Sequence, residues 1–450
     1  MIKSPVPRSL ELSDAGRADA RQAHNPPLDS RHLPARARVA LRLLERLQSG
    51  SLSVTLPDGQ HISFGPGHGM HADIVMSDWR CCDAALKSGD IGFAQTYIDG
   101  GWTTSDLTAL LKLFILNRNA IEGFVYGTWW GRLLYRVKHL LNGNSRAGSR
   151  RNIHAHYDIG NAFYRCWLDS SMTYSSALFG DAHVQDERTD ADELPRAQQA
   201  KYQRMLDVLQ LKPGASVLEI GCGWGGFAET GLRAGMQVTG LTLSTEQLAW
   251  AQQRCERVHA ELAAERASDV SPPATPDLRL QDYRDCHGQF DGIASIEMFE
   301  AVGEAYWPSY FAALARNLKQ GGRACIQTIV IDDALFARYR KGTDFIQQYI
   351  FPGGMLPSPT AFREQAEEAG LRVVDAHAFG LDYARTLRVW RERFLAELSI
   401  IRTQGFDDKF IRTWEFYLCY CEAAFRNHNT DVVQFTLEHA TNASNAPHVR

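Results

Sequence analysis

The sequence lacks the patterns that mark several large classes of protein. Its 450 residues contain nine cysteines but no CxxC pair, which argues against a zinc ribbon or a disulfide framework. The longest apolar run, 109–116, is interrupted by Lys112 and is shorter than the roughly 20 residues that cross a bilayer. The formal net charge of −4 gives no basic excess of the kind that nucleic-acid-binding proteins carry. We therefore expect no transmembrane span and no nucleic acid partner.

Targeting and metal-binding signals are also missing. Residues 1–34 hold no apolar core of the 7–15 residues that a signal peptide needs. None of the fifteen histidines lies in an HExxH or comparable ligand spacing, so no metal site is expected. These absences favour a reduced, cytoplasmic protein that would meet a membrane only at its surface.

The first third of the chain predicts a leader and a small domain. Five prolines among polar residues over 1–35 are typical of a flexible leader, and residues 36–143 predict a smaller α+β domain. The elements expected there are a helix at 36–47, a β-hairpin at 51–64, a strand at 74–76, a helix from Ser77, turns mixed with aromatics over 89–107, and a helix at 107–119 capped by Ser105 or Asp106.

Residues 124–141 combine tryptophans and tyrosines with arginines, and a basic run follows at 145–151. A basic amphipathic helix rich in Trp and Leu is typical of an interfacial membrane element. The same composition also suits a helix between domains that packs its aromatic side chains and exposes its arginines. The segment alone favours neither interpretation.

Residues 144–450 predict a second, larger domain, and from about Asn152 to Arg393 strands and helices alternate in it, which predicts a doubly wound parallel α/β sheet. Residues 268–276 look like an inserted loop, and 388–438 are predicted to be helical. The strands expected are 216–220, 237–241, 278–281, 290–295 and 323–331, with helices at 226–234, 244–267, 304–318 and 358–369.

The strongest motif is VLEIGCGWGGFAE at 217–229. A strand carrying Glu219 leads into a turn with Gly221 and Gly223, where missing Cβ atoms let a ligand approach the backbone. A dinucleotide site would present G-x-G-x-x-G, whereas E-x-G-x-G-x-G is the arrangement of S-adenosylmethionine-dependent methyltransferases. A purely structural glycine turn and NAD binding are the weaker alternatives.

Polar side chains also follow the next three strands, where ligands of parallel sheets bind. GLTLSTEQ places Thr242, Ser244 and Gln247 after the second strand, suited to ribose or methionine groups. LQDYRD places Gln281, Asp282 and Tyr283 after the third, suited to an adenine ring. Two carboxylates, Glu297 and Glu300, follow the fourth strand, and each is either catalytic or an exposed helix-cap residue.

Taken together, these motifs resemble the cyclopropane-fatty-acyl-phospholipid synthases and the related mycolic-acid methyltransferases. The blocks that carry the resemblance are HYDIGNAFYRCWLDSSMTYSSALF, VLEIGCGWGG, GLTLSTEQ, LQDYRD, MFEAVG, FIQQYIFPGGMLPSP, DYARTLRVWRERF and CEAAFRNHNTDVVQF, between His156 and Phe435. The resemblance implies a Rossmann-like class I methyltransferase domain with a seven-stranded, mostly parallel sheet, and it makes 36–143 a lipid-contact domain. It further implies action at a bilayer surface with unsaturated acyl chains, and a homodimer.

In that family S-adenosylmethionine methylates a double bond within a fatty acyl chain, and aromatic faces stabilise the resulting cation. Tyr174, Phe299 and Tyr383 are the candidates here. A bicarbonate ion then serves as the base. Its ligands match Glu300, Tyr383, the backbone of Ile329 and of Ser176, and Gln327, where the family has histidine. The resemblance also assigns Tyr174 and Ser175 to the methionine part of the cofactor, and an active-site role to Cys421, which is otherwise an inert buried thiol.

Four functions follow, of which a cyclopropane-forming enzyme acting on phospholipid is the first. Gln327 cannot titrate, so proton removal from another carbon would give a methylene- or methyl-branched chain instead. The other two are a methyltransferase for small molecules and a non-catalytic lipid-binding relative.

Overall fold

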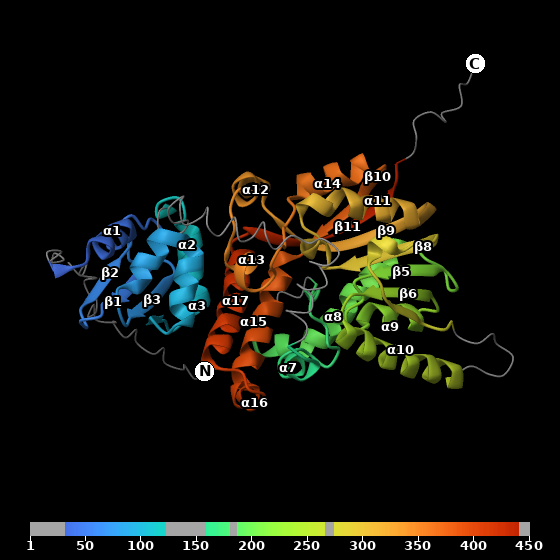
Figure 1. Ribbon diagram of the computed structural model, residues 1–450, viewed down its shortest axis with the longest axis horizontal. Coiled ribbons are helices and arrows are strands. Elements are labelled where there is room, and N and C mark those ends of the chain that lie inside the picture. The colour runs from blue at the N-terminus through green and yellow to red at the C-terminus, as the bar shows by residue number, and fades with distance from the viewer. Residues whose placement is uncertain (1–31, 123–158, 181–186, 266–273, 441–450) are drawn as a thin grey trace, which may run out of the picture. The chain divides into compact units, whose positions relative to one another are not determined.

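The computed structural model describes residues 32–122, 159–180, 187–265 and 274–440 (Figure 1). The predicted leader, the aromatic and basic segment at 124–141 and the loop at 268–276 lie wholly or mostly outside these residues. The domain boundary predicted near residue 143 lies outside them as well.

A small mixed sheet follows the first helix, α1 (Ala35–Leu44). Its strand order is β2-β1-β3-β4, with β1 antiparallel to β2 and parallel to β3. The strands alternate buried and less buried side chains because only one face of the sheet packs on protein. The elements of this part are β1 (Ser51–Thr55), β2 (His61–Phe64), β3 (His71–Met76), α2 (Arg80–Ile98), β4 (Trp102–Thr103) and α3 (Leu107–Leu116).

Helix α2 corrects one expectation. The turns expected over 89–107 occupy only part of that range, because α2 continues to Ile98 across a break at Gly89, whose φ is 61°. Trp102 is fully buried and stacks on Phe93 at 4.2 Å, and this packing explains the aromatic residues of the segment. Of the two candidate caps for α3, Asp106 is the one used, since its side chain accepts from Ala109 N at 2.9 Å.

The large sheet has the order β10-β11-β9-β8-β5-β6-β7. Five neighbouring strands are parallel, while β11 lies antiparallel between β9 and β10. The predicted seven-stranded, mostly parallel sheet is therefore confirmed. Its strands are β5 (Ser216–Ile220), β6 (Gln237–Thr242), β7 (Asp277–Leu280), β8 (Phe290–Ile296), β9 (Leu318–Ile331), β10 (Leu371–Ala378) and β11 (Thr430–His439).

The prediction of helices throughout 388–438 is wrong at its end. Helices α15 (Gly380–Ala396), α16 (Leu398–Thr403) and α17 (Asp408–Arg426) are followed by strand β11. Residues 432–437 are all buried, because β11 is an inner strand covered on both faces. A strand covered on both faces loses the alternation by which strands are recognised in a sequence.

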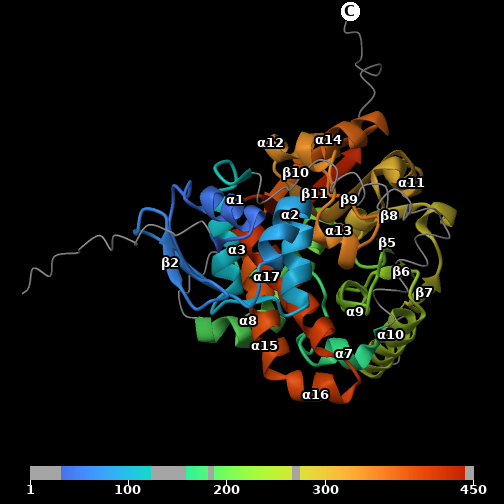
Figure 2. The same ribbon diagram turned by 60° about the vertical axis from the view of Figure 1, so that its left-hand side comes forward.

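Helices cover both faces of the large sheet. Figure 1 shows α11 and α14 on one face, with α9 and α10 on the other. In the turned view of Figure 2, α17 lies beside α2 and α3, against which it packs. The remaining bounds are α7 (Asn161–Arg165), α8 (Glu187–Leu209), α9 (Gly226–Arg233), α10 (Thr245–Glu265), α11 (Trp307–Asn317), α12 (Asp333–Tyr339), α13 (Phe345–Tyr349) and α14 (Pro359–Glu368), with short 3-10 turns η2 (Tyr283–Asp285), η3 (Phe299–Ala301) and η4 (Glu304–Tyr306).

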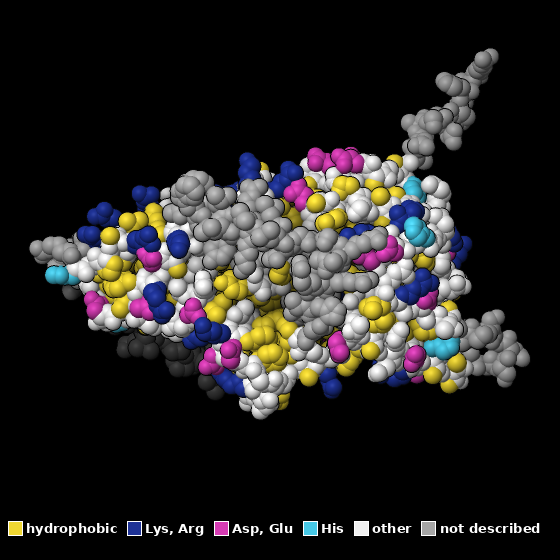
Figure 3. Space-filling view, in the orientation of Figure 1, with side chains coloured by type: hydrophobic (Ala, Val, Ile, Leu, Met, Phe, Trp, Pro, Cys, Tyr) yellow, Lys and Arg dark blue, Asp and Glu magenta, His cyan; other side chains and the backbone are white. Residues whose placement is uncertain are grey.

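On the face drawn in Figure 3, the acidic and basic side chains of the described residues are interspersed, and apolar side chains are exposed between them. None of the described helices combines the length and hydrophobicity that a bilayer-spanning segment requires. Among the same residues, no cluster of three or more His, Cys, Asp or Glu side chains could hold a metal ion.

Candidate active site

The glycine loop after β5 forms the floor of a cavity. Gly221 and Gly223 have φ values of 84° and 51°, the left-handed region that favours glycine. A Cβ atom on Gly221 would lie 2.9 Å from the Met298 side chain, whereas one on Gly223 would meet no atom within 4 Å. The turn therefore needs glycine for its conformation at both positions and for space at the first.

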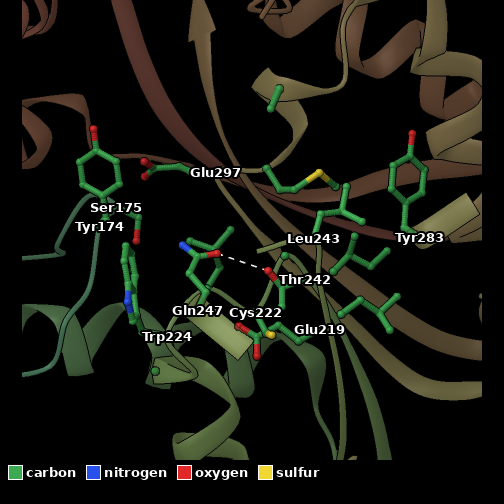
Figure 4. A pocket seen from close by; sticks show the side chains of 18 of the residues that line it. Tyr174, Ser175, Glu219, Cys222, Trp224, Thr242, Leu243, Gln247, Tyr283 and Glu297 are labelled. Carbon is green, nitrogen blue, oxygen red and sulfur yellow. Dashed lines mark hydrogen bonds between the residues drawn. The ribbon is translucent and has the colours of Figure 1, made fainter. Parts of the chain in front are cut away.

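This first cavity runs along the carboxyl ends of β5, β6, β7 and β8. Figure 4 shows Tyr174 and Glu297 at one end and Tyr283 at the other, with Gln247, Thr242 and Glu219 between them. Ten of the predicted cofactor residues line it: Tyr174, Ser175, Glu219, Gly221, Gly223, Thr242, Gln247, Gln281, Asp282 and Tyr283.

The remaining predicted residue, Ser244, does not line the cavity. Its hydroxyl accepts from Gln247 N at 3.2 Å, and its own N–H donates to Thr242 Oγ1. Ser244 therefore caps the start of α10 and fixes Gln247, whose Oε1 accepts from Thr242 Oγ1 at 3.3 Å. Its contribution to the cavity is indirect.

Two carboxylates of the cavity differ in their partners. Burial raises the pKa of Glu219 well above its ordinary value, and its Oε2 has no hydrogen-bond partner among the described residues. Asp282 is already paired, since its Oδ2 accepts from Arg284 Nη2 at 2.6 Å. An open glycine turn beside an unpaired buried acceptor suits a ligand with amino and hydroxyl groups, such as S-adenosylmethionine.

A second, more apolar cavity adjoins the first, and Tyr174, Glu297 and Ala301 line both. Apolar side chains such as Ile346, Phe351, Met355, Leu387 and Phe425 make up much of its wall. Of the predicted catalytic residues, Glu300, Ile329, Tyr383 and Cys421 line it.

A third cavity extends the second toward α2 and α3, because Tyr420 and Ala424 line both. Its apolar wall includes Phe93 of α2 and Leu111 and Phe114 of α3.

Three of the predicted catalytic residues, Ser176, Gln327 and Tyr383, donate hydrogen bonds to Glu297. Its Oε1 accepts from Ser176 N and from Gln327 Nε2, both at 2.8 Å. Its Oε2 accepts from the Tyr383 hydroxyl at 2.6 Å. Burial raises the pKa of the Glu297 carboxyl, while the charge of Lys201 and these three hydrogen bonds oppose that rise.

Glu300 has a different environment. Its Oε1 accepts from Ile329 N and from Thr328 Oγ1, whereas its Oε2 has no partner among the described residues. Burial, together with the charge of Glu297, raises the pKa of Glu300 to about 8. The N–H and O–H groups predicted to bind one bicarbonate ion are thus divided between the carboxyl groups of Glu297 and Glu300.

The aromatic residues predicted to stabilise the cation lie in different environments. Tyr174 lies in the wall of both cavities, and its hydroxyl is 2.8 Å from that of Tyr417. Phe299 lines neither cavity, because it is fully buried in the core against Trp307 and Tyr310. Its predicted role beside the acceptor chain does not fit this position.

Comparisons with known proteins give the family of the chain. Residues 144–435 match the model of the mycolic acid cyclopropane synthetase family. The chain belongs to this family. It is an S-adenosylmethionine-dependent methyltransferase of the cyclopropane synthase type.

Among its relatives, the tuberculostearic acid methyltransferase UfaA1 of Mycobacterium tuberculosis is 39% identical over 355 residues, which cover 78% of this chain and 79% of that protein. The cyclopropane-fatty-acyl-phospholipid synthase of Escherichia coli is 36% identical over 361 residues, 79% of this chain and 85% of that one. The cyclopropane synthase MmaA2 of M. tuberculosis has a similar structure, with a TM-score of 0.55, 29% identity and coverage of 64% of this chain and 97% of that one.

Sequence reasoning overlooked one residue beside this site, Lys201 of α8. Lys201 is fully buried, and its Nζ donates to Ser175 Oγ at 2.6 Å and to Gln198 Oε1 at 2.7 Å. Burial lowers the pKa of Lys201 to about 7. The available signal was a lysine at helical spacing from Leu194 and Ala197 on the apolar face of α8.

The predicted bicarbonate ion does not fit this arrangement. Three groups expected to hold it, Ser176 N, Gln327 Nε2 and the Tyr383 hydroxyl, all donate to Glu297. The fourth, Ile329 N, donates to Glu300. A side-chain carboxylate therefore occupies the hydrogen bonds that the ion would need.

Proposed function

We propose that this enzyme transfers the methyl group of S-adenosylmethionine to the cis double bond of an unsaturated acyl chain in a membrane phospholipid, and closes a cyclopropane ring. The observation that carries the proposal is the junction of the two cavities. Tyr174 and Glu297 line both the glycine-loop cavity and the apolar cavity. Bound S-adenosylmethionine would supply an electrophilic methyl group at this junction.

The residues of the first cavity suit the cofactor. Oε2 of Glu219 is a buried acceptor with no partner among the described residues, Gln247 is fixed by Thr242 and Ser244, and Tyr283 provides an aromatic face. The turn at Gly221 and Gly223 leaves room for the ligand against the backbone. These residues hold the donor and set the direction of its methyl group.

The second cavity suits an acyl chain. An alkene is a weak nucleophile, so it must be held in line with the methyl group and kept from water. The apolar wall excludes water, and the rings of Tyr174 and Tyr383 face the cavity where positive charge develops on the chain. Phospholipid as the carrier of that chain is supported by the name of the relative from E. coli.

One observation favours a second product, a methylene- or methyl-branched acyl chain. Gln327 occupies the position of a titratable histidine in the resemblance, and its amide cannot move a proton. The relative with 39% identity is named a methyltransferase and not a cyclopropane synthase. Removal of a proton from a neighbouring carbon, and not from the new methyl group, would give this product.

Other expectations remain predictions. They are a cytoplasmic location, association with the bilayer surface, the lipid-contact role of 36–143, a homodimer and an active-site role for Cys421. Burial raises the pKa of the Cys421 thiol, which suits a neutral wall residue of the second cavity.

Incubation of the purified protein with S-adenosylmethionine and dioleoyl phospholipid vesicles tests the proposal. We expect released fatty acids that have gained one CH2, with high-field ring protons in the proton NMR spectrum. Vinylidene protons would assign the branched product instead. Vesicles of saturated phospholipid are the matched control, and free oleate separates phospholipid from free acid as acceptor. Absence of product from every unsaturated lipid would overturn the proposal.

A further inference from the structure

We propose that the side chain of Glu297 is the base of this enzyme, taking the place that the family resemblance gives to a bicarbonate ion. The proposal rests on the proposed function, because a base is needed only once a methyl group has been added to an alkene. It is carried by the convergence of three donors on one carboxylate at the junction of the two cavities.

The three donors that a second anion would need already donate to the Glu297 carboxylate. Ser176 N and Gln327 Nε2 both reach Oε1 of Glu297, and the Tyr383 hydroxyl reaches Oε2. Each is a group predicted to bind bicarbonate. A separate anion at this point would have to displace the carboxylate from all three donors, and its charge would be repelled by Glu297.

The direction of the Gln327 amide follows from a chain of polar contacts. Arg204 can only donate, and its Nη1 lies 2.6 Å from Gln434 Oε1. This contact turns Gln434 Nε2 toward Gln327 Oε1, at 3.0 Å. Gln327 therefore presents its N–H group to Glu297. Gln327 and Gln434 are therefore positioning residues. They aim an N–H group at Oε1 of Glu297, which suits the ionised carboxylate.

The backbone of Glu297 is also unusual. Its φ is 49°, a conformation that favours glycine, and its N–H donates to Gln327 O at 2.8 Å. Strain of this kind persists where the surrounding structure holds it, and it often marks a functional residue. Here it places the carboxylate at the junction of the cavities, where the reacting carbon would lie.

The charge states of the two carboxyl groups follow from their partners. Burial raises the pKa of both carboxyl groups, but at Glu297 the nearby charge of Lys201 and three hydrogen-bond donors oppose that rise and favour the ionised form. At Glu300, no described residue donates to Oε2, and the charge of Glu297 raises the pKa in addition to burial. Of two neighbouring buried carboxyl groups, Glu297 is therefore the carboxylate and Glu300 the neutral acid.

The sulfonium S–C bond breaks as the new C–C bond forms, which leaves a cation on the acyl chain. Glu297 takes a proton from the added methyl group, and the electron pair of that C–H bond closes the ring. The neutral Glu297 then loses its proton to water after the product leaves.

Chemical rescue separates a built-in base from a bound ion. Wild-type protein should form product at the same rate in buffer freed of carbon dioxide as in buffer with added bicarbonate. Glu297→Gly should lose about 10²–10⁴-fold in kcat, the usual range for a general base, and should recover part of it with bicarbonate. Glycine also suits the positive φ at this position, so the variant should fold.

Glu297→Gln should lose as much without recovery, because the amide still fills the space. Glu367→Gln, on the exposed side of α14, is the matched control and should behave as wild type. Calorimetry should show that all of the variants still bind S-adenosylmethionine, which separates loss of the base from loss of the fold. Dependence of the wild type on bicarbonate, or near-normal turnover by Glu297→Gln, would overturn the role of Glu297. Absence of product from the wild type itself would instead overturn the proposed function, and this inference with it.

Discussion

The hydroxyl of Tyr383, on α15, donates a hydrogen bond of 2.6 Å to Oε2 of Glu297, at the end of β8. This contact joins the helical C-terminal part of the chain to the carboxyl edge of the parallel sheet. Both residues line the apolar cavity. The phenol is therefore placed to hold the carboxylate and to present an aromatic ring to the acyl chain.

Replacing Tyr383 by Phe tests the first of these tasks. The ring remains, but Glu297 loses a donor to its charged form. We expect kcat to fall about 10- to 100-fold, because a hydrogen bond to a charged group contributes about 1.5–3 kcal/mol. Affinity for S-adenosylmethionine, measured by calorimetry, should stay unchanged, since Tyr383 does not line the cofactor cavity. Tyr383→Leu removes the ring as well and should lose more, and equal losses in the two variants would contradict a separate role for the hydroxyl.

Replacing Glu300 by Gln should change how stability depends on pH. The folded state raises the pKa of Glu300 from 4.5 to about 8, so the native protein binds this proton more tightly than the unfolded chain. That contribution to stability is complete below pH 4.5 and is lost as pH rises to about 8. Glu300→Gln is neutral throughout and lacks this loss.

Urea unfolding at pH 5 and pH 8.5 measures the effect. The free energy of unfolding should fall more for the wild type than for Glu300→Gln, and Glu367→Gln should follow the wild type. Because the amide imitates the neutral acid, Glu300→Gln should also keep more turnover than Glu297→Gln. An identical pH dependence in wild type and Glu300→Gln would show that Glu300 is ionised across this range.

Replacing Lys201 by Met should move the pH profile of turnover. Glu297 must be ionised to act as the base, so activity rises with pH through its pKa. The charge of Lys201 lowers that pKa, and Glu300 and Tyr383 are the other titratable groups close to it. Without the cation, we expect the acidic limb of kcat/KM to shift upward by about one pH unit. Lys212→Met, at an exposed position, is the control, and an unmoved limb would contradict the electrostatic role of Lys201.

Much of this site could be predicted from the sequence, because its polar residues directly follow strands. Glu219, Thr242 and Asp282 each lie at the end of a parallel strand or just after it, and parallel strands end at one edge. The choice between Glu297 and Glu300 could not be made in the same way. It depends on a positive φ at Glu297, which turns one carboxylate toward Tyr383 and leaves the other on Ile329.

Other features depend on contacts between residues distant in the sequence. Gln434 lies on β11, where the sequence predicts a helix because the buried side chains of this strand do not alternate with exposed ones. Its contact with Gln327 arises only when β11 inserts between β9 and β10. The burial of Lys201 could not be predicted for a similar reason. A lysine on a helix is usually solvated, and its burial here depends on contacts with Ser175 and Gln198.

Narrowing the apolar cavity tests whether an acyl chain occupies it. Ala424 lines the second and the third cavity, and its side chain is small. Ala424→Trp would fill the passage between them without reaching the cofactor cavity, which Ala424 does not line. A long chain would then lose its path toward Phe93 and Phe114, whereas a short chain would need only the space near Glu297. We expect product formation from dioleoyl phospholipid to fall at least tenfold, with affinity for S-adenosylmethionine unchanged, and a smaller loss on phospholipids with shorter unsaturated chains. Equal losses at every chain length would place the acyl chain outside the third cavity.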